Sequence, residues 1–309
     1  AMMDMDTGAL RDDLARRLTA VHELTEGFFA PDAPIAEPEW GRDVTARWPD
    51  YPALRSARAV EIFKRLRPDI LTRLGEAARP EEALTNFDAF LAGLPAGVQL
   101  FSLFEANPQL TQLIVDICAT APALAQYLSR NAGVLDAVIG GGFFAPWPGV
   151  AALTKGLGET LAAAPDYEAA LNTARRWARE WHFRIGVHHL RGLVDAGTAG
   201  REYADLAEAV IAAIWPVVVE EFSAKHGAVP GQGAAVLGMG SLGAGRLNAQ
   251  SDLDLIVIYD ADTDGASDGR RPLPIRTYFA RLTQALVTAL SAPMADGRLY
   301  EVDMRLRPS

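Results

Sequence analysis

The sequence has one cysteine, Cys118, which rules out an intramolecular disulfide and a cysteine-rich zinc site. It has no apolar run approaching the roughly 18 residues of a membrane span, so none is expected. Positive charge is scarce: 29 Lys and Arg stand against 39 Asp and Glu, a net charge of −10. That balance disfavours nucleic acid as a general partner. The acidic start, with no apolar segment behind it, is no signal peptide, so a cytoplasmic protein is predicted.

Apolar residues recur at every third or fourth position through most of the first 228 residues, which predicts one helix after another. Half of the 309 residues are hydrophobic, enough for a large core, and the length suggests about two domains. Prolines separate several helices, and Pro68 is expected to interrupt the segment in which it lies. The predicted helices are Asp12–Phe29, Ser56–Leu74, Pro80–Leu91, Gly97–Ala106, Leu110–Thr120, Pro122–Leu128, Tyr167–Ala196 and Tyr203–His226.

The sequence pattern changes near Val229. The small apolar run Gly233–Leu237 and the β-rich run Leu253–Tyr259 predict two strands. A helix over Pro274–Ala292 and a strand over Arg298–Leu306 follow. We therefore predict an α+β fold, with an all-helical region over residues 1–228 and a small sheet with flanking helices over residues 229–309.

A glycine cluster follows the first predicted strand and matches a dinucleotide-binding pattern. Gly238, Gly240 and Gly243 have the G-x-G-x-x-G spacing, and Asp260 lies about 20 residues further on, where such folds place a ribose-binding acid. Parallel strands need a connection of about a dozen residues or more, however, and only residues 244–251 are available. No Gly-Lys-Ser/Thr follows the cluster either. The dinucleotide and P-loop interpretations are therefore disfavoured.

Two aspartates in the second predicted strand suggest a different chemistry. Alternate residues of a strand share a face, so Asp252 and Asp254 point together while Leu253 and Leu255 face the core. Adjacent carboxylates repel each other unless a cation lies between them, and Mg²⁺ prefers such oxygen ligands. The alternative is that both acids merely line the solvated end of a strand.

The last predicted strand offers a third carboxylate. Its odd-numbered residues include Asp303, Arg305 and Arg307, while its even-numbered residues are mostly apolar. If this strand pairs beside the second strand, Asp303 joins the two earlier acids, and the arginines stand near them as phosphate-binding cations. Three carboxylates beside a glycine-rich turn suit two-metal nucleotidyl transfer. The alternative is an exposed strand with Glu–Arg pairs.

These residues resemble a known superfamily. Gly240-Ser241, ten residues, then Asp252-Leu253-Asp254, with Asp303 on a later strand, resemble the nucleotidyltransferases that include DNA polymerase beta. More narrowly, the sequence resembles the glutamine synthetase adenylyltransferase family. The segments that carry this resemblance are Gly238–Gly243, Leu247-Asn248, Ser251–Ile256, Leu299–Ser309 and, upstream, Leu94–Phe104.

The resemblance implies a fold and an activity. The family's enzymes have two nucleotidyltransferase halves, one transferring AMP from ATP to a tyrosine of glutamine synthetase and the other removing it by phosphorolysis. The ending of this chain resembles the adenylylating half, and its helices resemble the linker between the halves. The sequence stops at Ser309, inside a sequence motif that is characteristic of the family, so a fragment is expected. Phosphorolytic deadenylylation and an inactive helical docking fragment are the alternatives.

The resemblance also implies roles for residues and partners. Asp252, Asp254 and Asp303 would bind Mg²⁺ and carry catalysis, while Gly240, Ser241, Arg305 and Arg307 would bind the phosphates of ATP. Glutamine synthetase would be the protein substrate, with a nitrogen-signalling regulatory protein as a further partner. Three positions depart from the family pattern, which has Lys at Ser241, Gly at Ala244 and Glu at Arg246.

Overall fold

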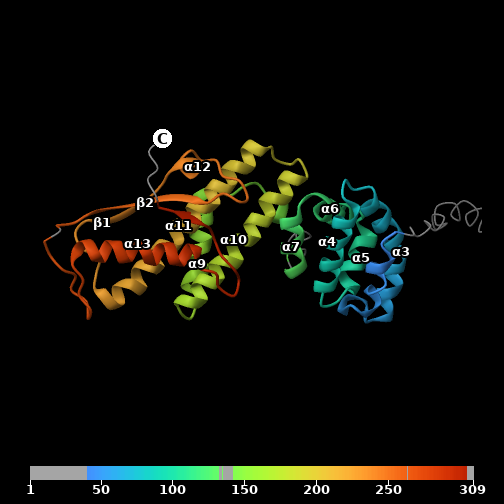
Figure 1. The fold of residues 1–309 in the computed structure, drawn as a ribbon, viewed down its shortest axis with the longest axis horizontal. Coiled ribbons are helices and arrows are strands. Elements are labelled where there is room, and N and C mark those ends of the chain that lie inside the picture. Colours follow the sequence, from blue (N-terminus) through green and yellow to red (C-terminus); the bar gives the residue numbers. More distant parts are fainter. Residues whose placement is uncertain (1–39, 132–133, 135–141, 263, 305–309) are drawn as a thin grey trace, which may run out of the picture.

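The computed structural model describes residues 40–131, 134, 142–262 and 264–304. Within these residues, a series of helices is followed by a small three-stranded sheet, so the predicted α+β class is confirmed. Figure 1 shows an elongated molecule with the first helices at one end and the sheet at the other. The predicted helix Asp12–Phe29 lies outside the described residues. None of the described helices is long and apolar enough to cross a membrane.

Prolines begin three of the first helices. α4 (Pro80–Gly93), α6 (Pro108–Thr120) and α7 (Pro122–Arg130) each have proline at the first helical position. Proline suits this position because its fixed φ is already helical and the missing N–H would have no helical partner. The predicted starts of α4 and α7 are confirmed, whereas α6 begins at Pro108 and not at the predicted Leu110. The other elements of this part are α2 (Arg42–Thr45), η1 (Trp48–Asp50), η2 (Pro52–Leu54), α3 (Ala57–Gly75) and α5 (Val98–Ala106).

The expected interruption at Pro68 is wrong, because α3 continues through this residue. A proline inside a helix removes one backbone hydrogen bond and crowds the preceding turn. Phe63 and Ile70, on either side of it, are both buried in one hydrophobic core. Packing of the two halves of α3 against the same core therefore outweighs the local cost of the proline.

Three further helices follow, of which the first was not predicted. α9 (Gly149–Ala162) precedes α10 (Tyr167–Leu190) and α11 (Ala196–His226), with the short η3 (Gly142–Phe144) before them. α10 ends before the predicted Ala196, and Gly192 in the following turn has a φ of 67°. α11 begins earlier than Tyr203 because Asp195 caps it, its carboxylate accepting the Thr198 N–H at 2.6 Å.

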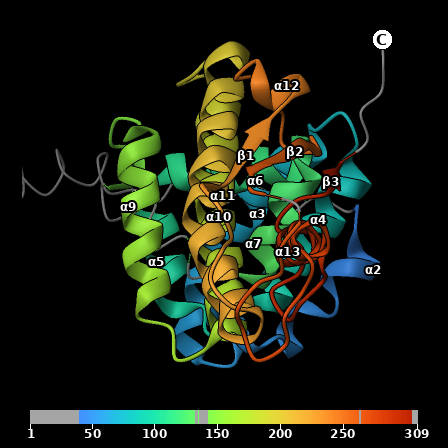
Figure 2. The ribbon, with the colours of Figure 1, turned by 90° about the vertical axis from the view of Figure 1, so that its left-hand side faces the viewer.

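The buried apolar residues form two hydrophobic cores. The first core is built from η1 through α7, together with Phe143 of η3 and with Phe183 and Val187 of α10. The second core runs from Leu157 in α9 to Tyr300, and so joins α9, α10 and α11 to the sheet. Figure 2 shows α9 and α13 on opposite sides of α11, which contacts both. α10 thus contributes to both cores, and the boundary between residues 228 and 229 stays a prediction.

The sheet has the order β1-β2-β3, formed by β1 (Gly233–Gly238), β2 (Leu253–Asp260) and β3 (Val302–Asp303). β1 and β2 are antiparallel, whereas β2 and β3 are parallel. The short α12 (Gly240–Gly243) lies between the first two strands, and α13 (Ile275–Ser291) lies between the last two. Antiparallel pairing of β1 and β2 excludes a dinucleotide-binding β-α-β unit, as the short connection predicted.

The two faces of the sheet differ in what covers them. Leu253 and Leu255 are fully buried in the second core, together with Leu282 and Leu286 of α13. On the other face, Ile258 is 50% exposed. The sheet therefore rests on α13 with one face and leaves the other open, which confirms the predicted alternation in β2.

Cys118 provides a direct test of the first core. Its side chain is 1% exposed, and burial raises the pKa of the thiol to about 12. Because only the thiolate reacts, we expect labelling by a thiol reagent at pH 8 to be at least ~100-fold slower in the native protein than in urea. Raising the pH from 8 to 9 should speed labelling of the unfolded chain only about 3-fold, because a thiol with a pKa of about 8.5 is already partly ionised, whereas a thiol with a pKa of about 12 gains thiolate about 10-fold. Equal rates in the two states would contradict the burial of this helix face.

Candidate functional site

Two of the predicted site acids are partners in the sheet. Asp254 of β2 is opposite Asp303 of β3 in the parallel register, and Leu253 is opposite Val302. The Leu253 N–H also donates to the Glu301 carbonyl at 2.9 Å. Register partners in neighbouring strands have side chains on the same face, with backbones about 4.8 Å apart. The structure thus brings the Asp254 and Asp303 side chains together, although the residues are far apart in sequence.

The residues around Asp303 alternate as the sequence indicated. Tyr300 is buried, and Val302 and Met304 pack against the second core. Burial raises the pKa of the Tyr300 hydroxyl above its ordinary value. The apolar residues of this segment therefore face the core, while Asp303 lies on the same open face as Asp254.

Asp252 lies just before β2, and a hydrogen-bonded turn leads the chain into it. The Gln250 N–H donates to Asn248 Oδ1 at 2.8 Å, and the Asn248 N–H donates to Ser251 Oγ at 3.0 Å. Asp252 is exposed, and Asp254 is half-buried. The sequence reading gave no role to Asn248 or Ser251, although Asn and Ser are residues that favour such turns. Their side chains fix the backbone from which Asp252 projects.

Gly240 forms the closest approach of the glycine cluster to these acids. Its φ is 52°, and a Cβ atom placed on it would lie 2.2 Å from Asp254 Oδ2. The neighbouring Met239 N–H donates to the Asp254 carbonyl oxygen at 2.8 Å. Only glycine fits this position, because it accepts the left-handed conformation and adds no atoms beside the carboxylate. The turn at Met239 and Gly240, where α12 begins, therefore lies directly against Asp254.

These residues suit a divalent cation bound to a phosphate compound. Carboxylate oxygens are the ligands that Mg²⁺ prefers, and glycine allows a ligand to approach the backbone closely. In the described parts of the chain, however, no three His, Cys, Asp or Glu side chains gather closely enough to hold a metal ion. The roles of Asp252, Asp254 and Asp303 as metal ligands stay predictions.

The structure describes only some of the remaining predicted site residues. Ser241 is exposed in α12, next to Gly240. Arg305 and Arg307 lie outside the described residues. Of the positions that depart from the family pattern, Ala244 ends α12, and the exposed Arg246 donates its N–H to the Ser241 carbonyl at 2.9 Å. The structure therefore places Ser241 next to Gly240, and the phosphate-binding roles of Ser241 and the two arginines stay predictions.

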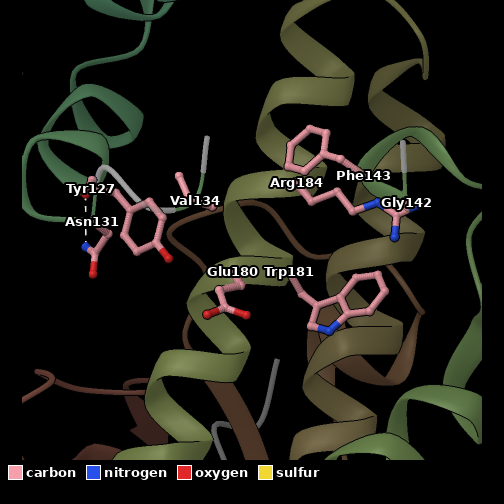
Figure 3. Close-up of a pocket in the computed structure, with 8 residues that line it drawn as sticks. All are labelled: Tyr127, Asn131, Val134, Gly142, Phe143, Glu180, Trp181 and Arg184. Carbon is pink, nitrogen blue, oxygen red and sulfur yellow. Dashed lines mark hydrogen bonds between the residues drawn. The ribbon is translucent and has the colours of Figure 1, made fainter. Parts of the chain in front are cut away.

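A cavity of about 500 Å³ lies elsewhere, between α7 and α10 (Figure 3). Burial and the charge of Glu180 raise the pKa of Tyr127 to about 12. Arg184 lies over the Trp181 ring, 4.8 Å from its centre. None of the predicted site residues lines this cavity, so the sheet face remains the candidate site. The lining residues are Tyr127, Asn131, Val134, Gly142, Phe143, Glu180, Trp181 and Arg184.

Comparison with known proteins identifies the sequences to which this chain is similar. A family profile described as glutamate-ammonia ligase adenylyltransferase matches residues 111–309. Bifunctional glutamine synthetase adenylyltransferase/adenylyl-removing enzymes of Brucella suis and Mesorhizobium japonicum are 45% and 44% identical over 260 residues, 84% of this chain and 26% of each relative. The Caulobacter vibrioides protein of the same name is 40% identical over 261 residues, 83% of this chain and 25% of the relative.

The chain spans about a quarter of the length of these curated relatives. Both the site segments and the helices from α7 onward, with most of α6, fall within the matched residues. The chain belongs to the glutamate-ammonia ligase adenylyltransferase family.

Proposed function

We propose that this chain carries the site that transfers AMP from ATP to a tyrosine hydroxyl of glutamine synthetase, with release of pyrophosphate. The observation that carries the proposal is the register of Asp254 opposite Asp303, with the Gly240 turn against Asp254. Paired carboxylates beside a glycine turn suit a metal-bound triphosphate better than they suit a neutral ligand. The relatives' names, which include adenylyltransferase of glutamine synthetase, supply the substrates of the proposal.

The proposed roles follow from the chemistry of each side chain. Asp252, Asp254 and Asp303 would hold Mg²⁺, which when bound neutralises phosphate charge and lowers the pKa of a tyrosine hydroxyl from about 10. Gly240 leaves room for a phosphate at the backbone, and the hydroxyl of Ser241 is a donor for a phosphate oxygen. Arg305 and Arg307 would add positive charge at the same face. The carboxylates would orient the nucleotide through Mg²⁺, and the turn at Gly240 and the two arginines would bind its phosphates.

The adenylylating direction is proposed from the chain's ending. The run Leu299–Ser309 resembles the adenylylating half of the family's enzymes more than the deadenylylating half. Removal of AMP by phosphorolysis is the second candidate, since the relatives' names include adenylyl-removing activity. A regulatory nitrogen-signalling partner stays a prediction from the resemblance.

Incubation of the purified protein with glutamine synthetase, Mg²⁺ and ATP labelled at the α-phosphate tests this proposal. Label on the synthetase supports AMP transfer, and label from γ-labelled ATP should not appear there because pyrophosphate leaves. Release of the AMP group of modified synthetase as ADP, on addition of phosphate alone, would favour the deadenylylating activity instead. If neither reaction occurs, the proposal is contradicted, and a docking role for the helices is favoured.

Substitution of one strand acid tests the metal-ligand assignment. Asp254→Asn removes a charge but keeps the shape, so we expect unfolding temperature to change little. AMP transfer should fall at least ~100-fold, because loss of a residue that merely supports a metal ligand already costs about 10–100-fold. Asp260→Asn is the matched control, since Asp260 is exposed at the other end of β2 and on the same face. Transfer retained by Asp254→Asn would remove this residue from the site.

A second test uses two glycines that share a backbone conformation. Gly240→Ala places a Cβ 2.2 Å from Asp254 Oδ2, whereas Gly245→Ala, at a φ of 65°, meets nothing within 4 Å. Both substitutions carry the strain of about 1 kcal/mol that a left-handed residue costs. Only Gly240→Ala must also displace the carboxylate, so we expect its transfer rate to fall at least ~10-fold below that of Gly245→Ala. Equal rates in steady-state assays would show that the turn does not shape the site.

A further inference from the structure

Arg175 of α10 is a fully buried arginine that is bound by backbone carbonyl groups alone. Its Nε donates to the Gly297 carbonyl at 2.7 Å, and its Nη1 donates to the Leu171 carbonyl at 2.8 Å. Its Nη2 donates to the carbonyls of Ala289 and Ala292, each at 2.9 Å. Among the described residues, Arg175 forms no salt bridge with a carboxylate. Three of its four partners therefore belong to the end of α13 and to the segment that leads from it to β3.

The position of these carbonyls explains how a buried cation is accommodated. Ala289 lies in the last turn of α13, and Ala292 is the residue that ends the helix. Carbonyls at a helix C-terminus have no partner within the helix and carry the negative end of its dipole. Arg175 supplies the missing donors and a positive charge at once. Burial lowers its pKa from the ordinary value, yet a guanidinium remains protonated in proteins.

The same helix contacts the turn that follows α13 at two further points. Arg176 forms a salt bridge with Asp296 at 2.8 Å. Gly297 has a φ of 79°, and a Cβ atom placed on it would lie 2.1 Å from Arg179 Nη2. Met294 and Gly297 exchange backbone hydrogen bonds at 2.8 and 3.0 Å, which closes the turn. The turn is thus held against α10 immediately before the chain enters β3.

The short length of β3 makes this anchor important for Asp303. Only two residue pairs join β3 to β2, and a shift by one residue would turn Asp303 to the opposite face. Between the turn and β3, the N–H groups of Leu299 and Tyr300 both donate to the Leu290 carbonyl, at 3.2 and 3.1 Å. These bonds depend on the position of the end of α13, which Arg175 fixes.

We infer that Arg175 is a positioning residue that holds the end of α13 and the Gly297 turn, so that Asp303 stays in register with Asp254. This inference rests on the proposed function in so far as Asp303 serves the metal-bound nucleotide. We call the four hydrogen bonds of Arg175 the clasp, and their existence does not depend on the proposed function. Arg175 touches neither the acids nor the open face of the sheet, and so acts through β3.

Arg175→Met and Arg175→Lys in the purified protein test the inference. Amide hydrogen exchange reports directly on the clasp: Arg175→Met should speed exchange at Leu253, Leu299 and Tyr300, while the β1–β2 amides stay protected. The Mg²⁺ concentration for half-maximal AMP transfer should rise about 10-fold, as for loss of an outer-shell support. Excess Mg²⁺ should then restore part of the rate. Arg175→Lys keeps the charge with fewer donors and should give smaller changes in both measurements.

Arg184→Met is the matched control, because Arg184 is also a buried arginine of α10 and donates to a backbone carbonyl, that of Ala145. It lies away from the α13–β3 segment, so exchange there and the Mg²⁺ requirement should not change. Unchanged exchange at Leu253 and Tyr300 in both Arg175 variants would overturn the clasp. Faster exchange with an unchanged Mg²⁺ requirement would overturn the positioning role.

Failure of the proposed function gives a different result. A wild-type protein that neither transfers AMP nor binds Mn²⁺-ATP in calorimetry would refute the proposed site, while the exchange data would still decide the clasp. If Arg175→Met does not fold, Arg175→Lys decides both parts of the inference. A lysine variant identical to wild type in exchange and in Mg²⁺ requirement would overturn it.

Discussion

The pairing of β2 with β3 is the contact on which the candidate site depends. It consists of two register pairs and the hydrogen bond from Leu253 to Glu301, yet it places Asp254 opposite Asp303. Two carboxylates in neighbouring strands repel each other, and this repulsion destabilises the pairing of β2 with β3. The stability of the pairing must therefore come from contacts other than those of the ladder itself. Burial of Leu253, Leu255 and Tyr300 on the opposite face supplies part of it.

The helices before the sheet supply the rest, because they share its core. α9, α10 and α11 bury their apolar faces in the same cluster as β2, α13 and Tyr300. α11 also contacts the loop after α12, where the Leu247 N–H donates to the Gly200 carbonyl at 3.0 Å. The segment that carries Asp252 is thus attached to α11, and the segment that carries Asp303 is attached to α10 and α13. The predicted boundary at residue 228 follows the change in sequence pattern, whereas the packing is continuous across it.

Local patterns in the sequence predicted the parts of the structure that local forces decide. The alternation of Leu253 and Leu255 with Asp252 and Asp254 gave β2 and its faces, and prolines gave the starts of α4 and α7. The prediction failed at Pro68, where packing on both sides of the residue outweighs its local preference. α9 was missed although Leu153, Leu157 and Leu161 have helical spacing and are buried. Its glycine residues obscured that signal.

The two halves of the acidic pair are fixed by different kinds of contact. Asp254 is held locally, by the alternation of β2 and by the nearby Gly240 turn, and both features can be read from consecutive residues. Asp303 is held through Arg175, whose hydrogen bonds reach residues 114 to 122 positions away. Such contacts leave no local pattern, since Arg175 and its neighbour Arg176 look like surface residues of a helix. Damage to the packing of α10 against α13 should therefore displace Asp303 first and leave Asp254 in place.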